Sequence, residues 1–190
     1  MDSVLLCDRC DGVNYHFKSN RSFVYYDDVS ARIVKRLKYS NRKYCARYIA
    51  ELMCENKKEF EGVDYITFVP IGEKRLKERG FNQAFEIANE ISKITGIEIL
   101  ELLKKVGNEK HQAGLTRKER MDNLKDSFVL VEENAKSVKG KNVLVIDDVF
   151  TTGATLSECA SVLNSKKSLK PKVITTYTFA KTKLFSTRKG

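Results

Sequence analysis

The chain has 190 residues, of which 42% are hydrophobic and 32% are charged, a balance typical of a globular domain and unlike that of a disordered chain. A domain of this length buries about 70% of the surface of its unfolded chain, so the sequence supports one full hydrophobic core. No apolar run reaches the roughly 18 residues that a membrane span needs, and the first 11 residues do not resemble a signal peptide, so we expect a cytoplasmic protein.

The net charge of +10 comes from 35 basic and 25 acidic residues and is unevenly distributed. Residues 31–48 hold seven basic residues and residues 159–190 hold eight, with no acidic residue in either stretch, so the remainder is net negative by five. Such stretches are typical of surfaces that bind nucleic acid, phosphorylated ligands or acidic proteins. Tyr39, Tyr44 and Tyr48 lie in or beside the first stretch and suit base stacking. A solvated helix face is the simpler interpretation.

Two cysteines near the start, Cys7 and Cys10, have the C-x-x-C spacing of half a zinc site. A closed structural zinc site needs four ligands. His16 is a possible third, but Cys45 and Cys54 cannot both join, because nine residues place them on opposite faces of one helix. A partial Zn²⁺ site and an unmetallated pair both remain open. The five cysteines are expected to be reduced thiols.

Hydrophobic periodicity predicts strands that alternate with helices. The predicted elements, in chain order, are a β-hairpin from the apolar runs 13–17 and 22–26, helices over 29–37 and 45–53, a strand over 65–69, a helix from Asn82 to Gly96, strands over 97–103, 127–131 and 143–146, a helix after Thr155, and a strand over 173–179. This alternation implies βαβ crossovers and a mainly parallel twisted sheet flanked by helices. We expect an appendage over 1–26, with the cysteine pair and the hairpin, and an α/β domain over 27–190.

The strand predicted over 143–146 leads directly into two carboxylates and a hydroxyl-rich turn. Its continuous apolar run is typical of a strand buried on both faces of a parallel sheet. Ligands of such sheets bind outside the carboxyl ends of the strands, which is where Asp147 and Asp148 are expected. Gly153 can adopt a positive φ, and Thr155 is expected to cap the next helix.

This turn has the properties of a phosphate site. Free backbone amides, the positive end of a helix dipole and hydroxyl groups all favour an anion there. The predicted phosphate-binding residues are Thr151, Thr152, Gly153, Ala154 and Thr155. The two carboxylates would repel the same phosphate, so we expect them to bind ribose hydroxyls and to stabilise positive charge at the anomeric carbon. An ordinary buried strand and polar turn would explain the apolar run, but not two adjacent acids and three threonines.

A basic loop over 69–83 is a second candidate anion site. It follows the predicted strand over 65–69 and precedes the helix capped by Asn82. Arg75 and Arg79 are the preferred ligands for a pyrophosphate, because a guanidinium donates two parallel hydrogen bonds. A charged loop with local Glu to Lys pairs is the alternative. The chain contains neither the P-loop nor the dinucleotide-binding glycine pattern.

The segment 147–155 resembles the phosphoribosyl pyrophosphate (PRPP) binding motif of type I phosphoribosyltransferases. Together with segment 75–83 and with Gln112, Leu115, Arg117, Arg120, Asn123 and Phe128, it resembles the ComF family over nearly the whole chain. The resemblance implies a type I phosphoribosyltransferase fold and a flap over 112–123, in which Arg117 and Arg120 face the pyrophosphate. It also implies Mg²⁺ bound with PRPP. Lys104 and Lys105 stand where the family usually has an arginine, and the cysteine pair resembles the last two ligands of a longer zinc module.

Two hypotheses follow from the residues and the resemblance. The first is an enzyme that binds PRPP and Mg²⁺ and transfers the phosphoribosyl group to an unidentified acceptor, with release of pyrophosphate. The alternative is a non-catalytic adaptor or sensor in DNA uptake that contacts single-stranded DNA or competence proteins. His111, within the flap-like segment, is a possible acid or base but is more simply a solvated histidine. The sequence does not identify the acceptor or the oligomeric state.

Overall fold

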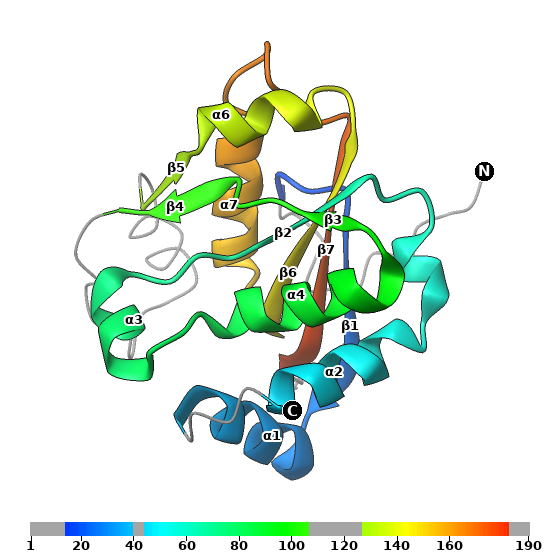
Figure 1. The fold of residues 1–190 in the computed structure, drawn as a ribbon, viewed down its shortest axis with the longest axis vertical. Coiled ribbons are helices and arrows are strands. Elements are labelled where there is room, and N and C mark those ends of the chain that lie inside the picture. Colours follow the sequence, from blue (N-terminus) through cyan, green and yellow to red (C-terminus); the bar gives the residue numbers. More distant parts are fainter. Residues whose placement is uncertain (1–13, 40–43, 107–126, 183–190) are drawn as a thin grey trace, which may run out of the picture.

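The computed structural model describes residues 14–39, 44–106 and 127–182, and five parallel strands form its centre (Figure 1). The strand order is β1-β7-β6-β2-β3, and each neighbouring pair is parallel. A two-stranded antiparallel sheet, β4-β5, lies beside it. The strands are β1 Ser19–Tyr26, β2 Tyr65–Phe68, β3 Glu98–Ile99, β4 Leu103–Lys105, β5 Phe128–Leu130, β6 Asn142–Phe150 and β7 Val173–Thr182.

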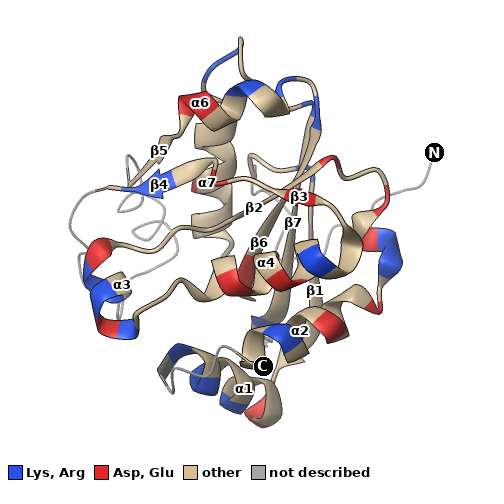
Figure 2. Ribbon diagram, viewed as in Figure 1, with Lys and Arg blue, Asp and Glu red and all other residues tan. Residues whose placement is uncertain are grey.

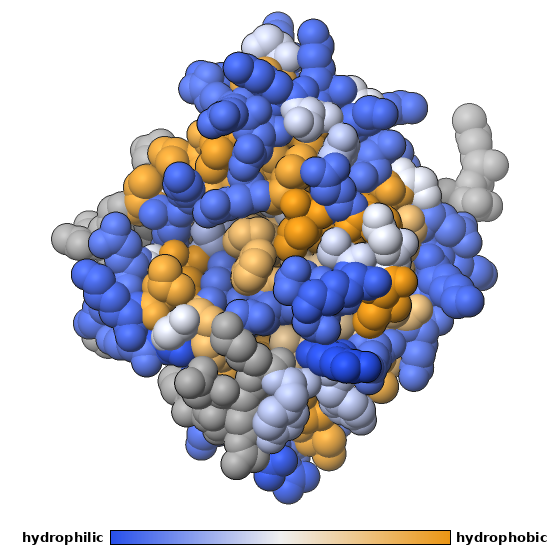
Figure 3. Space-filling model, viewed as in Figure 1, coloured by the Kyte–Doolittle hydropathy of each residue, from blue (hydrophilic) through white to orange (hydrophobic). Residues whose placement is uncertain are grey.

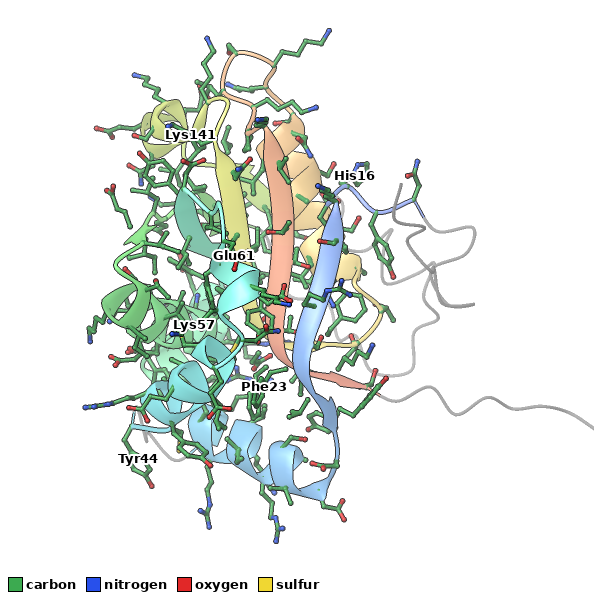
Figure 4. The ribbon with its side chains drawn as sticks, turned by 90° about the vertical axis from the view of Figure 1, so that its right-hand side faces the viewer. His16, Phe23, Tyr44, Lys57, Glu61 and Lys141 are labelled. Carbon is green, nitrogen blue, oxygen red and sulfur yellow. The ribbon has the colours of Figure 1, made fainter. Side chains whose placement is uncertain are left out.

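Helices lie on both faces of the large sheet. Viewed along the β1 edge, α2 and α4 lie on one side and α7 on the other (Figure 4). The helices are α1 Asp28–Tyr39, α2 Tyr44–Cys54, α3 Glu73–Arg79, α4 Gln83–Thr95, α6 Glu132–Ala135 and α7 Ala154–Asn164, with 3₁₀ turns at η1 Lys57–Phe60 and η2 Lys136–Val138. The predicted α/β fold with a mainly parallel sheet is therefore confirmed.

The core forms where the hydrophobic patterns predicted it. Four consecutive residues of β6, 143–146, are buried, because helices cover both faces of this central strand. Helix α4 begins as predicted at Asn82, whose Oδ1 accepts a hydrogen bond from the Ala84 amide at 3.0 Å. The Nδ2 of Asn82 also donates to the carbonyl of Val69 at 3.0 Å. Asn82 thus fixes the basic loop at both of its ends.

The predicted N-terminal hairpin is wrong. Residues 19–26 form one strand, β1, which pairs in parallel with β7. Polar residues in the predicted turn and directly after it have partners on β7 instead: Thr176 Oγ1 donates to Asn20 Oδ1 at 2.8 Å, and Ser22 Oγ lies 2.7 Å from Thr178 Oγ1. Cross-strand hydroxyl pairs stabilise a sheet, so the polar segment was favourable in a strand. Residues 19–26 therefore belong to the main sheet, while the cysteine pair lies outside the described residues.

Two further elements differ from the prediction. The strand predicted over 97–103 is divided between β3 and β4, which belong to different sheets, because the Leu100 amide still donates to β2 at Ile66 and the chain then turns away. The basic loop contains the short helix α3, which begins after Gly72. No helix of the described residues is long and apolar enough to cross a membrane. On the face shown in Figure 3, hydrophilic residues predominate and hydrophobic ones form separate patches.

Candidate functional site

A cavity of about 130 Å³ lies beside the two carboxylates of β6. It exists because β2 ends at Phe68, which pairs with Ile146, while β6 continues to Phe150. The residues that line it come from seven elements and from the turn after β2: Lys38, Val69, Pro70, Ile71, Arg75, Arg79, Gln83, Lys105, Phe128, Asp147, Asp148 and Thr155. The fold thus brings the predicted acids, the predicted arginines and one predicted threonine to one cavity.

The two adjacent acids have different surroundings. Successive side chains of a strand point to opposite faces of the sheet. Asp148 has a side chain that is only 6% exposed, and its Oδ2 lies 2.6 Å from the Nζ of Lys38, on α1. Asp147 interacts electrostatically with Cys159 on α7 and Lys105 on β4. Both carboxylates nevertheless line the cavity, which lies past the last pair of β2 with β6, Phe68 with Ile146.

Lys38 is the site residue that sequence reasoning missed. It lies in the first basic stretch and was interpreted only as part of a basic helix face. The signal available was its position in the last turn of α1, directly after the fully buried Leu37. That position holds Lys38 close to the core, but nothing in the sequence links it to Asp148. Figure 2 shows the basic residues along α1 and α3, the two helices that supply cations to the cavity.

Burial, and after it the negative charge of Asp148, raises the pKa of Asp147 to about 7. The Asp148 amide donates to Oδ1 of Asp147 at 2.8 Å, and this bond, with the charges of Lys38 and Lys105, opposes the rise. The ionised form is disfavoured because little water reaches it and a second carboxylate lies beside it. Asp147 therefore holds its proton more tightly in the folded protein than in the unfolded chain.

This raised pKa gives a testable pH dependence. Between about pH 4 and pH 7 the folded state binds more protons at Asp147 than the unfolded state, so the free energy of unfolding falls as the pH rises through this window. Asp147→Asn should remove that fall and should make the protein more stable than the wild type at pH 8. Urea denaturation of both proteins at pH 5, 6, 7 and 8 measures the difference. If the free energy of unfolding changed with pH in the same way in both proteins, that result would contradict the raised pKa of Asp147.

The arginines predicted for pyrophosphate lie on α3. Arg75 and Arg79 are four residues apart, so they share one face of the helix, and both line the cavity. The Nη1 of Arg79 donates to Oε1 of the buried Gln83 at 3.1 Å, which fixes its guanidinium beside α4. Of the two lysines that replace an expected arginine, Lys105 lines the cavity and Lys104 is exposed.

The phosphate-like turn joins β6 to α7. Gly153 has φ +76° and occupies the N-cap position, so the prediction that Thr155 caps the helix is wrong. Thr155 already lies within the helix, whereas Thr152 Oγ1 accepts a hydrogen bond from the Ala154 amide at 3.3 Å. Among the described residues, the amides of Gly153, Thr155 and Leu156 have no hydrogen-bond acceptor. Free amides at a helix N-terminus favour an anion, as the sequence indicated.

Several predicted residues lie outside the described residues: Cys7, Cys10, His111, Gln112, Arg117, Arg120 and Asn123. The flap and the partial zinc site therefore stay predictions. Within residues 14–39, 44–106 and 127–182, no group of three His, Cys, Asp or Glu side chains is arranged to hold a metal ion. The cysteines of these ranges, Cys45, Cys54 and Cys159, are free thiols, as expected.

Comparisons with known proteins identify a domain family and curated relatives. The phosphoribosyl transferase domain family matches residues 78–186. The chain is 30% identical to Competence protein F of Haemophilus influenzae over 73% of its length and 63% of that protein, and 26% identical to Competence protein ComFC of Bacillus subtilis over 78% and 59%. It thus spans about three fifths of these curated relatives. A hypoxanthine phosphoribosyltransferase of Staphylococcus aureus superimposes with a TM-score of 0.41 at 14% identity, covering 77% of this chain and 71% of that one.

Proposed function

The chain belongs to the phosphoribosyl transferase domain family, in which it is a ComF-like member, and we propose that its cavity binds PRPP together with Mg²⁺. One observation carries this proposal: two carboxylates of β6 and two arginines of α3 line one cavity beside the N-terminus of α7. Carboxylates that line the cavity, with anion-binding groups from α3 and from the turn before α7, match a ribose that carries a phosphate at one end and a pyrophosphate at the other.

Each part of PRPP has a proposed set of partners. Asp147 and Asp148 accept hydrogen bonds from the ribose hydroxyls, and the amides and hydroxyls of residues 151–155 bind the 5′-phosphate. Arg75 and Arg79 bind the pyrophosphate, and Mg²⁺ arrives with PRPP as part of the substrate. A cavity of about 130 Å³ is smaller than typical ligand pockets. It suits the ribose alone, with the phosphates at its rims.

The proposed reaction is transfer of the phosphoribosyl group to a nucleophilic acceptor. The bond from the anomeric carbon to the pyrophosphate oxygen breaks, its electron pair leaves with pyrophosphate, and the lone pair of the acceptor forms the new bond. The negative charge of Asp148, and that of Asp147 in its ionised form, stabilises the positive charge that develops on the ribose. The described residues do not single out a pocket for one acceptor class.

Calorimetric titration tests the binding step. We expect wild-type protein to bind PRPP in the presence of Mg²⁺ and to bind ribose 5-phosphate more weakly, because that compound lacks the pyrophosphate. A screen of nucleobases and ammonia for pyrophosphate release then tests for turnover. Absence of PRPP binding at millimolar ligand with Mg²⁺ present would reject the proposed function, whereas binding without pyrophosphate release would favour a sensor.

The second candidate function, a non-catalytic adaptor in DNA uptake, is supported by the names of the relatives and by one surface. Helix α1 exposes Arg32, Lys35 and Arg36, and the tyrosines Tyr44 and Tyr48 of α2 are 61% and 53% exposed. Cations with exposed aromatic rings suit single-stranded DNA. Fluorescence anisotropy with a labelled oligonucleotide at 50 and 200 mM salt tests it. A DNA contact predicts affinity that falls steeply with salt, and absence of binding at 50 mM would reject it.

A further inference from the structure

Residues 15–18 form a strap that ties the turn before α7 to the rest of the domain. The Tyr15 hydroxyl donates to the Thr152 carbonyl at 2.9 Å. The His16 amide donates to Ser157 Oγ at 3.3 Å, and the Lys18 amide donates to the Ile174 carbonyl at 2.8 Å. Figure 4 shows His16 where the chain passes beside α7 and enters β1. The strap therefore runs from the candidate phosphate turn to the large sheet.

The ring of Tyr15 lies directly against this turn. It stacks on Phe17, with ring centroids 4.8 Å apart, and meets the edge of Phe150 at 6.3 Å. A Cβ added to Gly153 would lie 2.7 Å from the Tyr15 ring and 2.7 Å from the Phe150 ring. The two rings thus leave room for a glycine only, and Phe17, itself buried, holds the Tyr15 ring in place.

The hydroxyl contact has a consequence for the direction of one backbone amide. The peptide between Thr152 and Gly153 is trans, so its carbonyl and its N–H point in opposite directions. The Thr152 carbonyl points toward the Tyr15 hydroxyl, so the Gly153 N–H points away from Tyr15. Glycine has access to both signs of φ, so without this anchor the peptide plane can rotate and carry the N–H with it.

We propose that Tyr15 is a positioning residue for the phosphate: by donating a hydrogen bond to the Thr152 carbonyl, it fixes the Gly153 amide in the direction that binds the 5′-phosphate. This inference rests on the proposed function and adds a residue to it from outside the PRPP-like motif. Tyr15 touches no substrate itself. It acts through one peptide plane, and its effect is confined to ligands that carry the 5′-phosphate.

Tyr15→Phe tests the proposal, because it removes the hydroxyl and keeps the ring. Tyr177→Phe is the matched control: its buried hydroxyl also donates to a carbonyl, that of Met53 at 3.1 Å, on the other face of the sheet. By calorimetry, Tyr15→Phe should weaken PRPP·Mg²⁺ and ribose 5-phosphate about three- to tenfold, the effect of one hydrogen bond, and leave pyrophosphate unchanged. Tyr177→Phe should leave all three unchanged. Equal losses for all three ligands in Tyr15→Phe, or none, would overturn the proposal.

A second measurement keeps this inference separate from the proposed function. In ligand-free protein, the amide resonance of Gly153 should show exchange broadening in Tyr15→Phe and remain single and sharp in the wild type and in Tyr177→Phe. An unchanged Gly153 resonance would overturn the positioning role of Tyr15. If the wild type binds neither PRPP nor ribose 5-phosphate, the proposed function fails, and the amide measurement alone decides whether Tyr15 orients the turn.

Discussion

Asp148→Asn should weaken the binding of PRPP·Mg²⁺ by roughly ten- to a hundred-fold. A hydrogen bond to a charged group contributes about 1.5–3 kcal/mol, and each 1.4 kcal/mol is a factor of ten. Asp148 lies in the cavity with its carboxylate almost fully buried, so water does not replace the lost charge. The substitution also leaves the Lys38 ammonium without its carboxylate, which adds positive charge where the ribose cation would develop. Calorimetric titration with PRPP in the presence of Mg²⁺ measures the loss.

Asp64→Asn provides the control for this measurement. Asp64 is also an aspartate beside β6, but it lies at the opposite end, where its Oδ2 accepts a hydrogen bond from the Asn142 amide at 2.8 Å. Its replacement tests the general effect of removing one carboxylate from the domain. We expect it to leave the affinity for PRPP unchanged. Unchanged affinity in Asp148→Asn as well would remove Asp148 from the proposed ribose site.

Gly153→Ala should lower the free energy of unfolding by about 2–5 kcal/mol. Its φ of +76° disfavours any residue with a Cβ by about 1–2 kcal/mol. The new methyl group would also lie 2.7 Å from the rings of Tyr15 and Phe150, and overpacking of this kind costs typically 1–3 kcal/mol. Both rings are packed against neighbours, so neither can move without displacing the strap or the end of β6. Urea denaturation monitored by circular dichroism measures the change.

Gly140→Ala separates the two causes. Gly140 has φ +70°, close to that of Gly153, but an added Cβ there would meet nothing within 4 Å. Its substitution should lower the free energy of unfolding only by the contribution of the positive φ, about 1–2 kcal/mol. The difference between the two variants reports the contact with the aromatic rings. Equal destabilisation by both substitutions would show that the rings yield and that the turn is less tightly packed than the structure indicates.

Much of the fold was predictable because local patterns and tertiary packing agree. The helices α1, α2 and α4 follow apolar periodicity, and α4 has both a capping Asn82 and a terminal Gly96. The two wrong strand predictions have one cause: the sequence does not show which strand edge is available for pairing. The polar run at 18–21 resembles a turn until Thr176 of β7, whose Oγ1 donates to Asn20 Oδ1, provides a partner for it. For the same reason, the predicted strand over 97–103 divides between two sheets.

In the candidate site, too, some residues were predictable from the sequence and others were not. Its acids, its arginines and its threonine-rich turn were recognisable from the sequence, because the chemistry of binding a sugar phosphate requires those residue types next to strand ends. Lys38 and Tyr15 carried no such signal. They are 110 and 137 residues away from their partners Asp148 and Thr152, and only the fold brings them into contact.

By itself, the sequence determined the α/β architecture and the residue types that approach a ligand, since both depend on periodicities and motifs that act over a few residues. The tertiary structure alone decided which charges meet, which peptide plane is anchored and which carboxylate keeps its proton. Those properties depend on distances and burial between segments far apart in the chain, and no local pattern encodes them.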